Sequence, residues 1–292
     1  MSGQRGFLRH IEACNRAQPG DYLPFTIGGA AVGRVRHDIA HRLAEFPDLF
    51  VVGVRDVALH PGFADFDARS AALADAVDRL VKIGIVAKRR RELYPVAARF
   101  TDAPLAALDR GAVATLGVRA YGVHVNGLVR KPGGLHLWIG TRAMDKLVAP
   151  GKLDNLVAGG QPIGLSLTQN LIKECAEEAD LPETLARQAH AVGAITYAMG
   201  VGDGLRADTL FVYDLALDAE FVPRNTDGEL ESFSLMPVEE VAERVRATDD
   251  FKFNVNLVII DFLIRRGVIA PDHPEYLDLL SGLHRDHPTF WR

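Results

Sequence analysis

Apolar residues recur with helical spacing in two segments of the first hundred positions, residues 39–46 and 71–83. In the second segment Leu73, Val77 and Leu80 lie three and four positions apart, so a helix would carry them on one stripe. Such a stripe is typical of an amphipathic helix that buries one face. This region is therefore predicted to be mostly helical, with some strand.

Two other stretches of the same region lack this spacing. Residues 50–54 form a short apolar run, Phe-Val-Val-Gly-Val, which predicts a strand. Residues 22–25 precede the glycine pair Gly28 and Gly29, and we interpret them as part of a turn or loop.

From about Leu116 the pattern changes to alternation of apolar and polar positions, which is typical of strands. Residues 118–125 and 135–140 alternate in this way, and the turn sequence Lys-Pro-Gly-Gly separates them at residues 131–134. Two alternating runs around such a turn predict a β-hairpin. Further strands are predicted near residues 191–199, 209–217 and 230–235.

One clear helix interrupts these strands over residues 166–179. Ser166 is suited to cap its start, with Gln169 three residues later in the reciprocal arrangement called a capping box. Two more helices are predicted after the strands, one beginning at residue 237 and a closing one over residues 253–266. Strands, one helix, further strands and carboxy-terminal helices together predict a mixed sheet packed between helices.

Composition and charge exclude several classes of protein. Of the 292 residues, 48% are hydrophobic and 24% are charged, which is ordinary for a folded chain rather than a disordered one. The net charge of −5 gives no electrostatic reason to expect nucleic acid as a partner. The longest apolar stretch, residues 255–264, is too short to span a bilayer.

The cysteine content and the amino terminus bear on the compartment. Two cysteines, Cys14 and Cys175, do not make a disulfide framework in a chain of this length, and this favours a reducing compartment. The first fifteen residues carry scattered charges and lack the apolar core of a secretory signal. We therefore predict a cytoplasmic protein.

Three glutamates share one face of the helix predicted over residues 166–179. Glu174, Glu177 and Glu178 stand at positions i, i+3 and i+4, so their carboxylates project from adjacent turns and repel one another. A divalent cation such as Mg²⁺ would offset this repulsion, because it prefers a few carboxylates together with water and substrate phosphates. The preceding pair Gly159-Gly160 permits close backbone approach, and we predict that it binds a diphosphate substrate. The alternative for the glutamates alone is a solvated acidic face.

The segment from Gly159 to Leu181 resembles the Nudix box. In that motif a glycine, five residues, a glutamate and seven residues precede an ending of Arg-Glu-apolar-any-Glu-Glu-any-Gly-apolar. Without gaps, Gly159 matches the leading glycine, Lys173 the arginine and the three glutamates those of the ending. The resemblance implies that Glu174, Glu177 and Glu178 bind Mg²⁺ or Mn²⁺. It also implies that Glu177 and Glu178 act in the hydrolysis of a diphosphate linked to another moiety.

Three positions depart from the box. Leu165 replaces the first glutamate, so that acid is absent. Lys173 keeps the charge of the arginine but lacks its planar fork. The lysine would therefore hold the neighbouring glutamates less firmly than the arginine does. Asp180 replaces the glycine after the helix, where aspartate tolerates the left-handed conformation better than most residues. Because the metal-binding acids survive all three changes, we predict an active enzyme.

This variant of the box is similar to that of the Nudix proteins related to thiamine metabolism. The likeness extends to residues 154–155, 212–215, 221–223 and 227–229. It implies hydrolysis of thiamine diphosphate, or of its damaged oxidised forms, to the monophosphate. Two alternatives stay open: a non-catalytic Nudix-type ligand-binding or regulatory domain, and a nucleotide-sugar or dinucleotide pyrophosphatase of the same fold.

The resemblance also carries expectations about fold and partners. We expect an α+β chain whose residues 113–292 form a Nudix domain, an α/β/α sandwich around a mixed sheet, with carboxy-terminal helices. Residues 1–112 are expected to form a smaller α/β domain that covers the substrate. The expected partner is a small-molecule diphosphate, with no nucleic acid and no membrane, and a homodimer is the one assembly that we consider.

Several residues outside the box are secondary candidates for the site. Nudix enzymes often take a further acid from a later loop, as metal ligand or general base, and Glu229 is favoured over Glu231 for this role. A solvent-exposed turn is the alternative for both. Arg119, Lys152 and Arg142 are candidates for phosphate contact, because cationic side chains pair well with phosphate. Arg119 is the best of the three since it lies within an otherwise apolar strand, and surface solvation is the alternative for each.

Four further features are interpreted as structural. The basic run at residues 88–91 is followed at once by Glu92, which favours a solvated helix end over an anion-binding patch. Trp138 is expected in the core rather than stacked on a ligand. His136 and His190 match no zinc motif.

Overall fold

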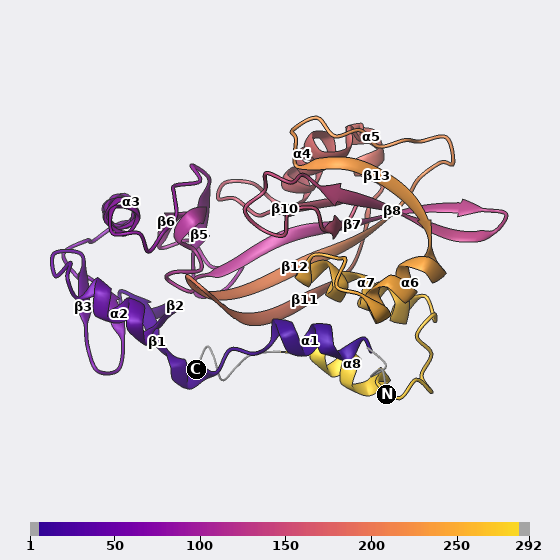
Figure 1. The fold of residues 1–292 in the computed structure, drawn as a ribbon. Helices are drawn as coiled ribbons and strands as arrows, with labels where there is room; N and C mark the ends of the chain where they lie inside the picture. Colours follow the sequence, from indigo (N-terminus) through magenta and orange to yellow (C-terminus); the bar gives the residue numbers. More distant parts are fainter. Residues whose placement is uncertain (1–5, 286–292) are drawn as a thin grey trace.

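The computed structural model describes residues 6–285, which form a four-stranded, a seven-stranded and a two-stranded sheet together with helices. Figure 1 shows the four-stranded sheet at one end of the molecule and the large sheet at the other, with the two-stranded sheet between them. The protein thus has the predicted α+β architecture. None of the helices in this part of the chain has the length and apolarity that a bilayer crossing requires.

The four-stranded sheet is built from the amino-terminal region, with strand order β2-β1-β4-β3. Its elements are β1 (Tyr22–Ile27), β2 (Ala30–Arg36), α2 (His37–Leu43), β3 (Phe50–Val52), β4 (Val57–Leu59) and α3 (Phe66–Lys82). The predicted helices and the predicted strand at residue 50 are confirmed. Helix α3 begins where the Asp65 carboxylate accepts from the Ala68 N–H at 2.8 Å, and it buries Leu73, Val77 and Leu80.

The prediction of a turn or loop at residues 22–25 is wrong, because these residues lie in β1. Only Gly28 and Gly29 form the turn, with φ angles of 58° and 83° that favour glycine. Strand β1 pairs with β2 on one side and, in parallel, with β4 on the other. One edge of β1 is therefore covered by β4, a strand about thirty residues later in the chain.

A small sheet follows α3 and leads into the large one. It consists of β5 (Leu93–Val96) and β6 (Ala106–Asp109), which pair antiparallel, and the short 3-10 helix η2 (Arg110–Ala112) comes next. Strand β6 packs on α3. Buried Tyr94 and Leu108 join the core of the four-stranded sheet. The expected domain boundary after residue 112 stays a prediction.

The large sheet is mixed, as predicted, with order β11-β12-β7-β8-β13. Strands β12 and β7 run parallel, and the other pairs are antiparallel. The hairpin β7-β8 turns at residues 131–134, as predicted. Strand β10 pairs with β7, and β9 pairs with β8. The bounds are β7 (Arg119–Lys131), β8 (Gly134–Arg142), β9 (Leu153–Asp154), β10 (Val157–Gly160), β11 (His190–Val201), β12 (Gly204–Ala216) and β13 (Leu230–Pro237).

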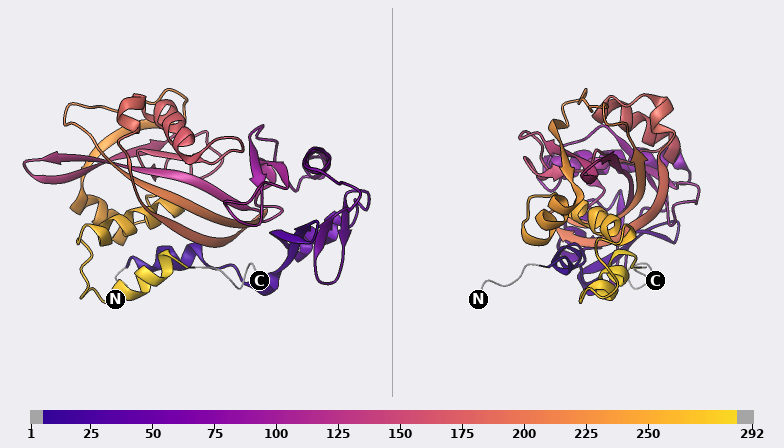
Figure 2. Two further views of the ribbon diagram at one scale, coloured as in Figure 1. Left: turned by 180° about the vertical axis from the view of Figure 1, so that it is seen from behind. Right: turned by 90° about the vertical axis from the view of Figure 1, so that its right-hand side faces the viewer.

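Helices cover both faces of the large sheet (Figures 1 and 2). One face carries α4 (Leu167–Ala179) and α5 (Glu183–Ala186), over a core that includes Leu171 and Cys175. The other face carries α1, α6, α7 and α8, over a second core. Their bounds are α1 (Leu8–Cys14), α6 (Val238–Ala247), α7 (Phe253–Arg265) and α8 (Tyr276–Leu283). Helix α8 follows the helix that was predicted to close the chain.

Helix α1 packs against α7 and α8 rather than against the four-stranded sheet. Ile11 and Cys14 are buried there, and the Phe7 N–H donates to the Glu275 carboxylate at 2.9 Å. The beginning of the described chain therefore completes the core formed by its end.

Candidate active site

Helix α4 begins and ends as its sequence predicts. The Gln169 N–H donates to Ser166 Oγ at 3.2 Å, and the Ser166 N–H donates to Gln169 Oε1 at 2.8 Å, which completes the capping box. The helix ends at Asp180, which is left-handed with φ of 52° and ψ of 36°. The replacement of the box glycine by aspartate is thus compatible with the expected turn.

The three glutamates of α4 occupy different environments. Glu174 and Glu178 are buried, whereas the Glu177 side chain is 45% exposed. Lys173 Nζ lies 3.2 Å from Glu174 Oε1 and 2.7 Å from Glu177 Oε2. The lysine that replaces the box arginine therefore contacts two glutamates with a single ammonium group.

Burial governs the protonation of the two inner glutamates. It raises the pKa of Glu174, while the Lys173 ammonium opposes the rise and Glu177 adds to it. Burial also raises the pKa of Glu178 well above its ordinary range, although the Ala158 N–H donates to Glu178 Oε2 at 2.8 Å and favours the charged form. A nearby positive charge would therefore stabilise the charged form of both carboxyls.

The glycine pair of β10 permits contacts from two sides. A Cβ at Gly159 would lie 2.2 Å from the Glu174 carboxyl carbon, and a Cβ at Gly160 would lie 1.6 Å from Tyr94 Oη. The Ile163 N–H also donates to the Leu93 carbonyl at 2.8 Å. The side chains of Glu174 and Tyr94 thus occupy the space that a Cβ at these glycines would fill. The predicted contact of the glycines with a diphosphate stays a prediction.

Beside α4 lies a cavity of about 130 Å³, which we call the acidic cavity. Six acidic side chains line it, against two basic ones. The acidic residues are Glu92, Glu174, Glu177, Glu178, Asp227 and Glu229, and the basic ones are Arg110 and Lys173. The predicted metal-binding residues therefore face one small space with a surplus of negative charge.

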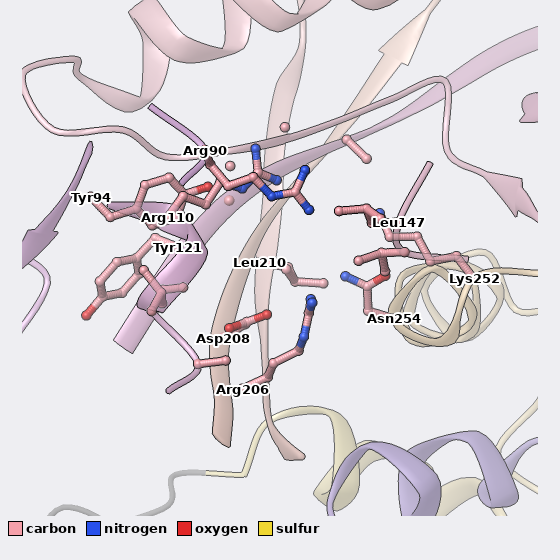
Figure 3. A pocket seen from close by; sticks show the side chains of 18 of the residues that line it. Arg90, Tyr94, Arg110, Tyr121, Leu147, Arg206, Asp208, Leu210, Lys252 and Asn254 are labelled. Carbon is pink, nitrogen blue, oxygen red and sulfur yellow. The ribbon is translucent and has the colours of Figure 1, made fainter. Parts of the chain in front are cut away.

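A larger cavity of about 250 Å³, which we call the basic cavity, adjoins the first. Its charged lining is six basic and three acidic side chains: Arg90, Arg110, Arg142, Lys146, Arg206, Lys252, Asp203, Asp208 and Glu229. Figure 3 shows Arg90 and Arg110 on one side of this space and Arg206 with Asp208 on the other. Five residues line both cavities and form what we call the shared wall: Arg110, Ala158, Gly159, Gly160 and Glu229.

The donor set of the acidic cavity suits Mg²⁺ or Mn²⁺, because both prefer carboxylate oxygens. Within residues 6–285, however, no three acidic, histidine or cysteine side chains converge as a ready-made cation site. The Lys173 ammonium contacts Glu174 and Glu177 where a cation would be held. The residues therefore fit such an ion in chemistry, and receiving it requires the ammonium to move aside.

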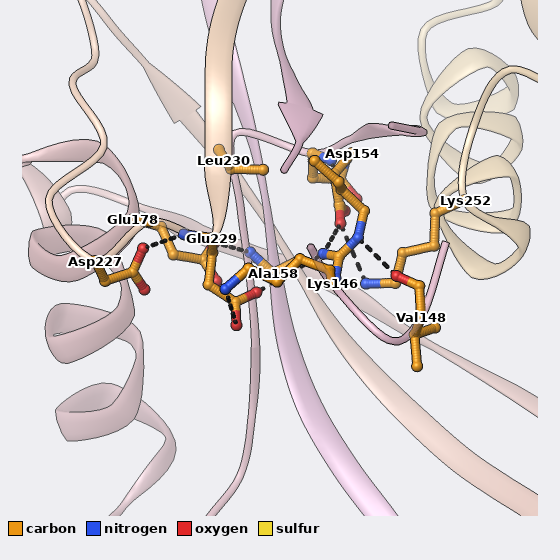
Figure 4. Close-up of polar contacts among 12 residues, drawn as sticks. Lys146, Val148, Asp154, Ala158, Glu178, Asp227, Glu229, Leu230 and Lys252 are labelled. Atoms are coloured by element: carbon orange, nitrogen blue, oxygen red, sulfur yellow. Dashed lines mark hydrogen bonds and ion pairs between the residues drawn. The ribbon is translucent and has the colours of Figure 1, made fainter. Parts of the chain in front are cut away.

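Glu229 lies on the shared wall, and Glu231 lines neither cavity. The Glu229 carboxylate is 3.7 Å from Lys146 Nζ and 3.8 Å from Arg142 Nη1. Figure 4 shows it close to Glu178 and Asp227. This placement is compatible with the preference for Glu229, whose catalytic role stays a prediction.

The structure does not bring Arg119 and Lys152 to either cavity. Arg119 is the first residue of β7 and interacts with the Tyr121 hydroxyl. Lys152 Nζ donates to the Asp249 carbonyl at 2.6 Å. Arg142 does line the basic cavity, but it is buried and its Nη1 lies 2.9 Å from Asp154 Oδ2, so its positive charge is already paired.

The basic side chains that line the cavity from other elements were not predicted. The run at residues 88–91 was the available signal, but α3 ends at Lys82, so the run is not a helix end. It lies in a loop, and its Arg90 lines the basic cavity. Trp138 is buried, as predicted, and both cysteines are buried and free.

Comparison with known proteins finds one matching family and similar plant proteins. Residues 6–120 match the family described as "Domain of unknown function (DUF4743)". The chain is 42% identical over 282 residues to Nudix hydrolase 24, chloroplastic, of Arabidopsis thaliana, which covers 95% of this chain and 77% of that protein. Nudix hydrolase 20, chloroplastic, of the same plant is 42% identical over 289 residues, with the same coverage.

Among solved structures, DR0079 of Deinococcus radiodurans is similar, with 18% identity and a TM-score of 0.43 over 57% of this chain and 95% of that one. The two plant relatives are named as chloroplastic, so a cytoplasmic location for this chain stays a prediction. Each of the two plant relatives matches this chain over 95% of its length. The protein therefore belongs to the Nudix hydrolase family.

Proposed function

We propose that this hydrolase is metal-dependent and cleaves a diphosphate linkage, with Glu174, Glu177 and Glu178 as ligands of Mg²⁺ or Mn²⁺. One observation carries the proposal: an acidic cavity and a basic cavity meet at the shared wall. A substrate that carries phosphates and binds cations needs both environments side by side. The acidic side attracts the cation, and the basic side attracts the phosphoryl oxygens.

The ion would supply charge neutralisation for the reacting phosphoryl group. The chain itself would position the ligands. Glu178 is oriented by the Ala158 N–H, and Glu174 reaches the cavity because Gly159 leaves room for it. Lys173 would act as a counter-charge that keeps Glu174 and Glu177 together until a cation replaces it.

A water molecule must attack the diphosphate, and Glu229 is our candidate for the base that receives its proton. It lies on the shared wall, so it faces the place where phosphate and cation would meet. A base has to reach the attacking water within hydrogen-bond distance. Glu177 and Glu178 would act beside it as ligands.

For the substrate we propose thiamine diphosphate or one of its oxidised forms. The resemblance of residues 154–155, 212–215, 221–223 and 227–229 supports this choice. The lining of the basic cavity includes the ring of Tyr121 and the Asp208 carboxylate. Aromatic faces suit the rings of thiamine, and a carboxylate suits its amino group and its positive charge. A small-molecule partner and a homodimer stay predictions.

The experiment that tests the function is a hydrolysis panel. The protein would be incubated with Mg²⁺ or Mn²⁺ and thiamine diphosphates, nucleotide sugars, dinucleotides and oxidised nucleotides, and released phosphate and monophosphate would be measured. We expect Glu177→Gln to lose about a hundredfold or more in turnover. Glu183→Gln serves as a control, because Glu183 is an exposed glutamate of α5 that lines neither cavity.

Equal turnover by wild type and Glu177→Gln would refute the metal-site assignment. Brisk cleavage of another diphosphate without cleavage of any thiamine compound would refute the substrate assignment alone.

A further inference from the structure

The segment from residue 88 to residue 111 places two arginines at the basic cavity from outside the large sheet. Arg90 belongs to the loop after α3, and Arg110 begins η2. Both lie within residues 6–120, the part of the chain that matches a family of unknown function. Arg110 also lines the acidic cavity, so it stands where the two cavities meet.

One buried carboxylate fixes the backbone at both arginines. Asp109 Oδ1 accepts from the Arg90 N–H at 2.9 Å and from the Gly111 N–H at 2.8 Å, and Oδ2 accepts from the Arg91 N–H at 2.9 Å. Asp109 is buried, so these charge-assisted hydrogen bonds are shielded from water. Asp109 therefore ties the two loops that carry Arg90 and Arg110, in addition to the pairing of β5 with β6.

The Arg110 guanidinium is oriented by an ion pair but, unlike that of Arg142, it remains open to the cavity. Its Nη1 donates to Glu92 Oε2 at 2.8 Å, and its Cζ lies 5.7 Å from the centre of the Tyr94 ring. The side chain is still 50% exposed. Its remaining N–H groups are available to an anion in the cavity.

The Arg90 guanidinium points into the same cavity, as Figure 3 shows. No carboxylate of residues 6–285 forms an ion pair with it, in contrast to Arg89, which pairs with Asp78. Two guanidinium groups that face one cavity repel each other, and a bound anion removes that repulsion. Planar guanidinium groups match phosphate oxygens with paired hydrogen bonds.

We propose that Arg90 and Arg110 form an anion-binding clamp that takes the phosphoryl groups of the substrate. The identity of that substrate rests on the proposed function, whereas the clamp itself binds a phosphate or diphosphate anion without metal. The site for the anion is thus completed by the amino-terminal segment, which reaches the box through Tyr94 and Gly160. Asp109 acts as the positioning residue of the clamp.

The clamp can be tested with inorganic pyrophosphate, by titration calorimetry in metal-free buffer. We expect wild type to bind it, and Arg90→Ala and Arg110→Ala to bind about ten- to a hundredfold more weakly, since each loses charge-assisted hydrogen bonds. Arg110→Lys should lose less than Arg110→Ala, because lysine keeps the charge but not the fork. Arg42→Ala is the matched control, with a side chain 48% exposed that pairs with Glu45 at 3.0 Å.

Three results would overturn the clamp: no binding by wild type, unchanged binding in both alanine variants, or an equal loss in Arg42→Ala. Arg90→Ala keeps the test decisive if Arg110→Ala folds poorly, because the Arg90 side chain is exposed. Turnover measurements separate this proposal from the proposed function. Pyrophosphate binding that depends on Arg90, together with full turnover by Glu177→Gln, would leave the clamp standing and refute the metal site.

Discussion

Replacing Gly160 by alanine tests how the amino-terminal segment is joined to the box. The new Cβ would lie 1.6 Å from Tyr94 Oη and 2.8 Å from Tyr94 Cζ. The first distance is about 2 Å shorter than the optimum of roughly 3.5–4.0 Å between non-bonded atoms. Tyr94 is buried and its ring lies beneath Arg110, so it has little room to move away.

The expected cost is that of overpacking a core, about 1–3 kcal/mol in the free energy of unfolding. Tyr94→Phe removes the atom in closest conflict. Alone it should change stability little, because no residue between 6 and 285 forms a hydrogen bond with that hydroxyl. In the double variant the phenylalanine should recover part of the loss, which gives a coupling energy of about 1 kcal/mol.

Urea denaturation followed by circular dichroism measures these free energies in the four proteins of the cycle. Gly133→Ala is the control: no atom lies within 4 Å of its Cβ position, so it should be neutral or slightly stabilising. Hydrolysis should also fall in Gly160→Ala, because the displaced ring supports Arg110. Additive effects of the two substitutions, or a Gly160→Ala loss no larger than that of Gly133→Ala, would refute the reasoning.

Three other experiments probe neighbouring parts of the structure. Gly159→Ala brings a Cβ within 2.2 Å of the Glu174 carboxyl carbon, so phosphate release should fall about a hundredfold; undiminished release would contradict the placement of Glu174. Burial raises the pKa of Cys14 and of Cys175 to about 12, so iodoacetamide at about pH 8 should label both only in urea, as counted by mass spectrometry. Burial lowers the pKa of His124 to about 4, below its unfolded value of about 6.5, so the unfolded chain takes up the proton first as the pH falls. The free energy of unfolding should therefore drop by at most ~3 kcal/mol between about pH 6.5 and pH 4. In His124→Asn this slope should flatten, and an unchanged slope would exclude His124 as its source.

The elements predicted correctly are those that a local signal in the sequence marks. The turn at residues 131–134 marks the β7-β8 hairpin, although both strands are buried at consecutive positions rather than at alternate ones, and the capping box of α4 depends on residues three positions apart. Strand β1 is not predicted from the sequence, because its partner β4 is distant in sequence and because its proline and the following glycines indicate a turn. Pairing between distant strands has no local signal.

The residues of the candidate site also divide into those that local spacing predicts and those that only the fold brings together. The glutamates of α4 could be predicted because one helix carries them at fixed spacing. Arg90 and Arg110 are separated by twenty positions, and both line the basic cavity because the β5-β6 pairing and the hydrogen bonds of Asp109 join the two loops. Arg119 is predicted for its place in an apolar strand, yet it is the first residue of β7 and lines neither cavity. Charge in a strand does not by itself indicate which cavity the side chain faces.

The packing of α1 against α7 and α8 constrains how the protein folds during synthesis. One face of the large sheet stays open until α6, α7 and α8 have been synthesised, and until then α1, which precedes them in the chain, has β11 but neither α7 nor α8 to pack against. Contacts of such large sequence separation close slowly, since the loop entropy is lost before the contacts form. The apolar face of the sheet that α7 and α8 cover is thus exposed until they are made. Nascent chains halted before α7 should therefore be the ones that chaperones retain.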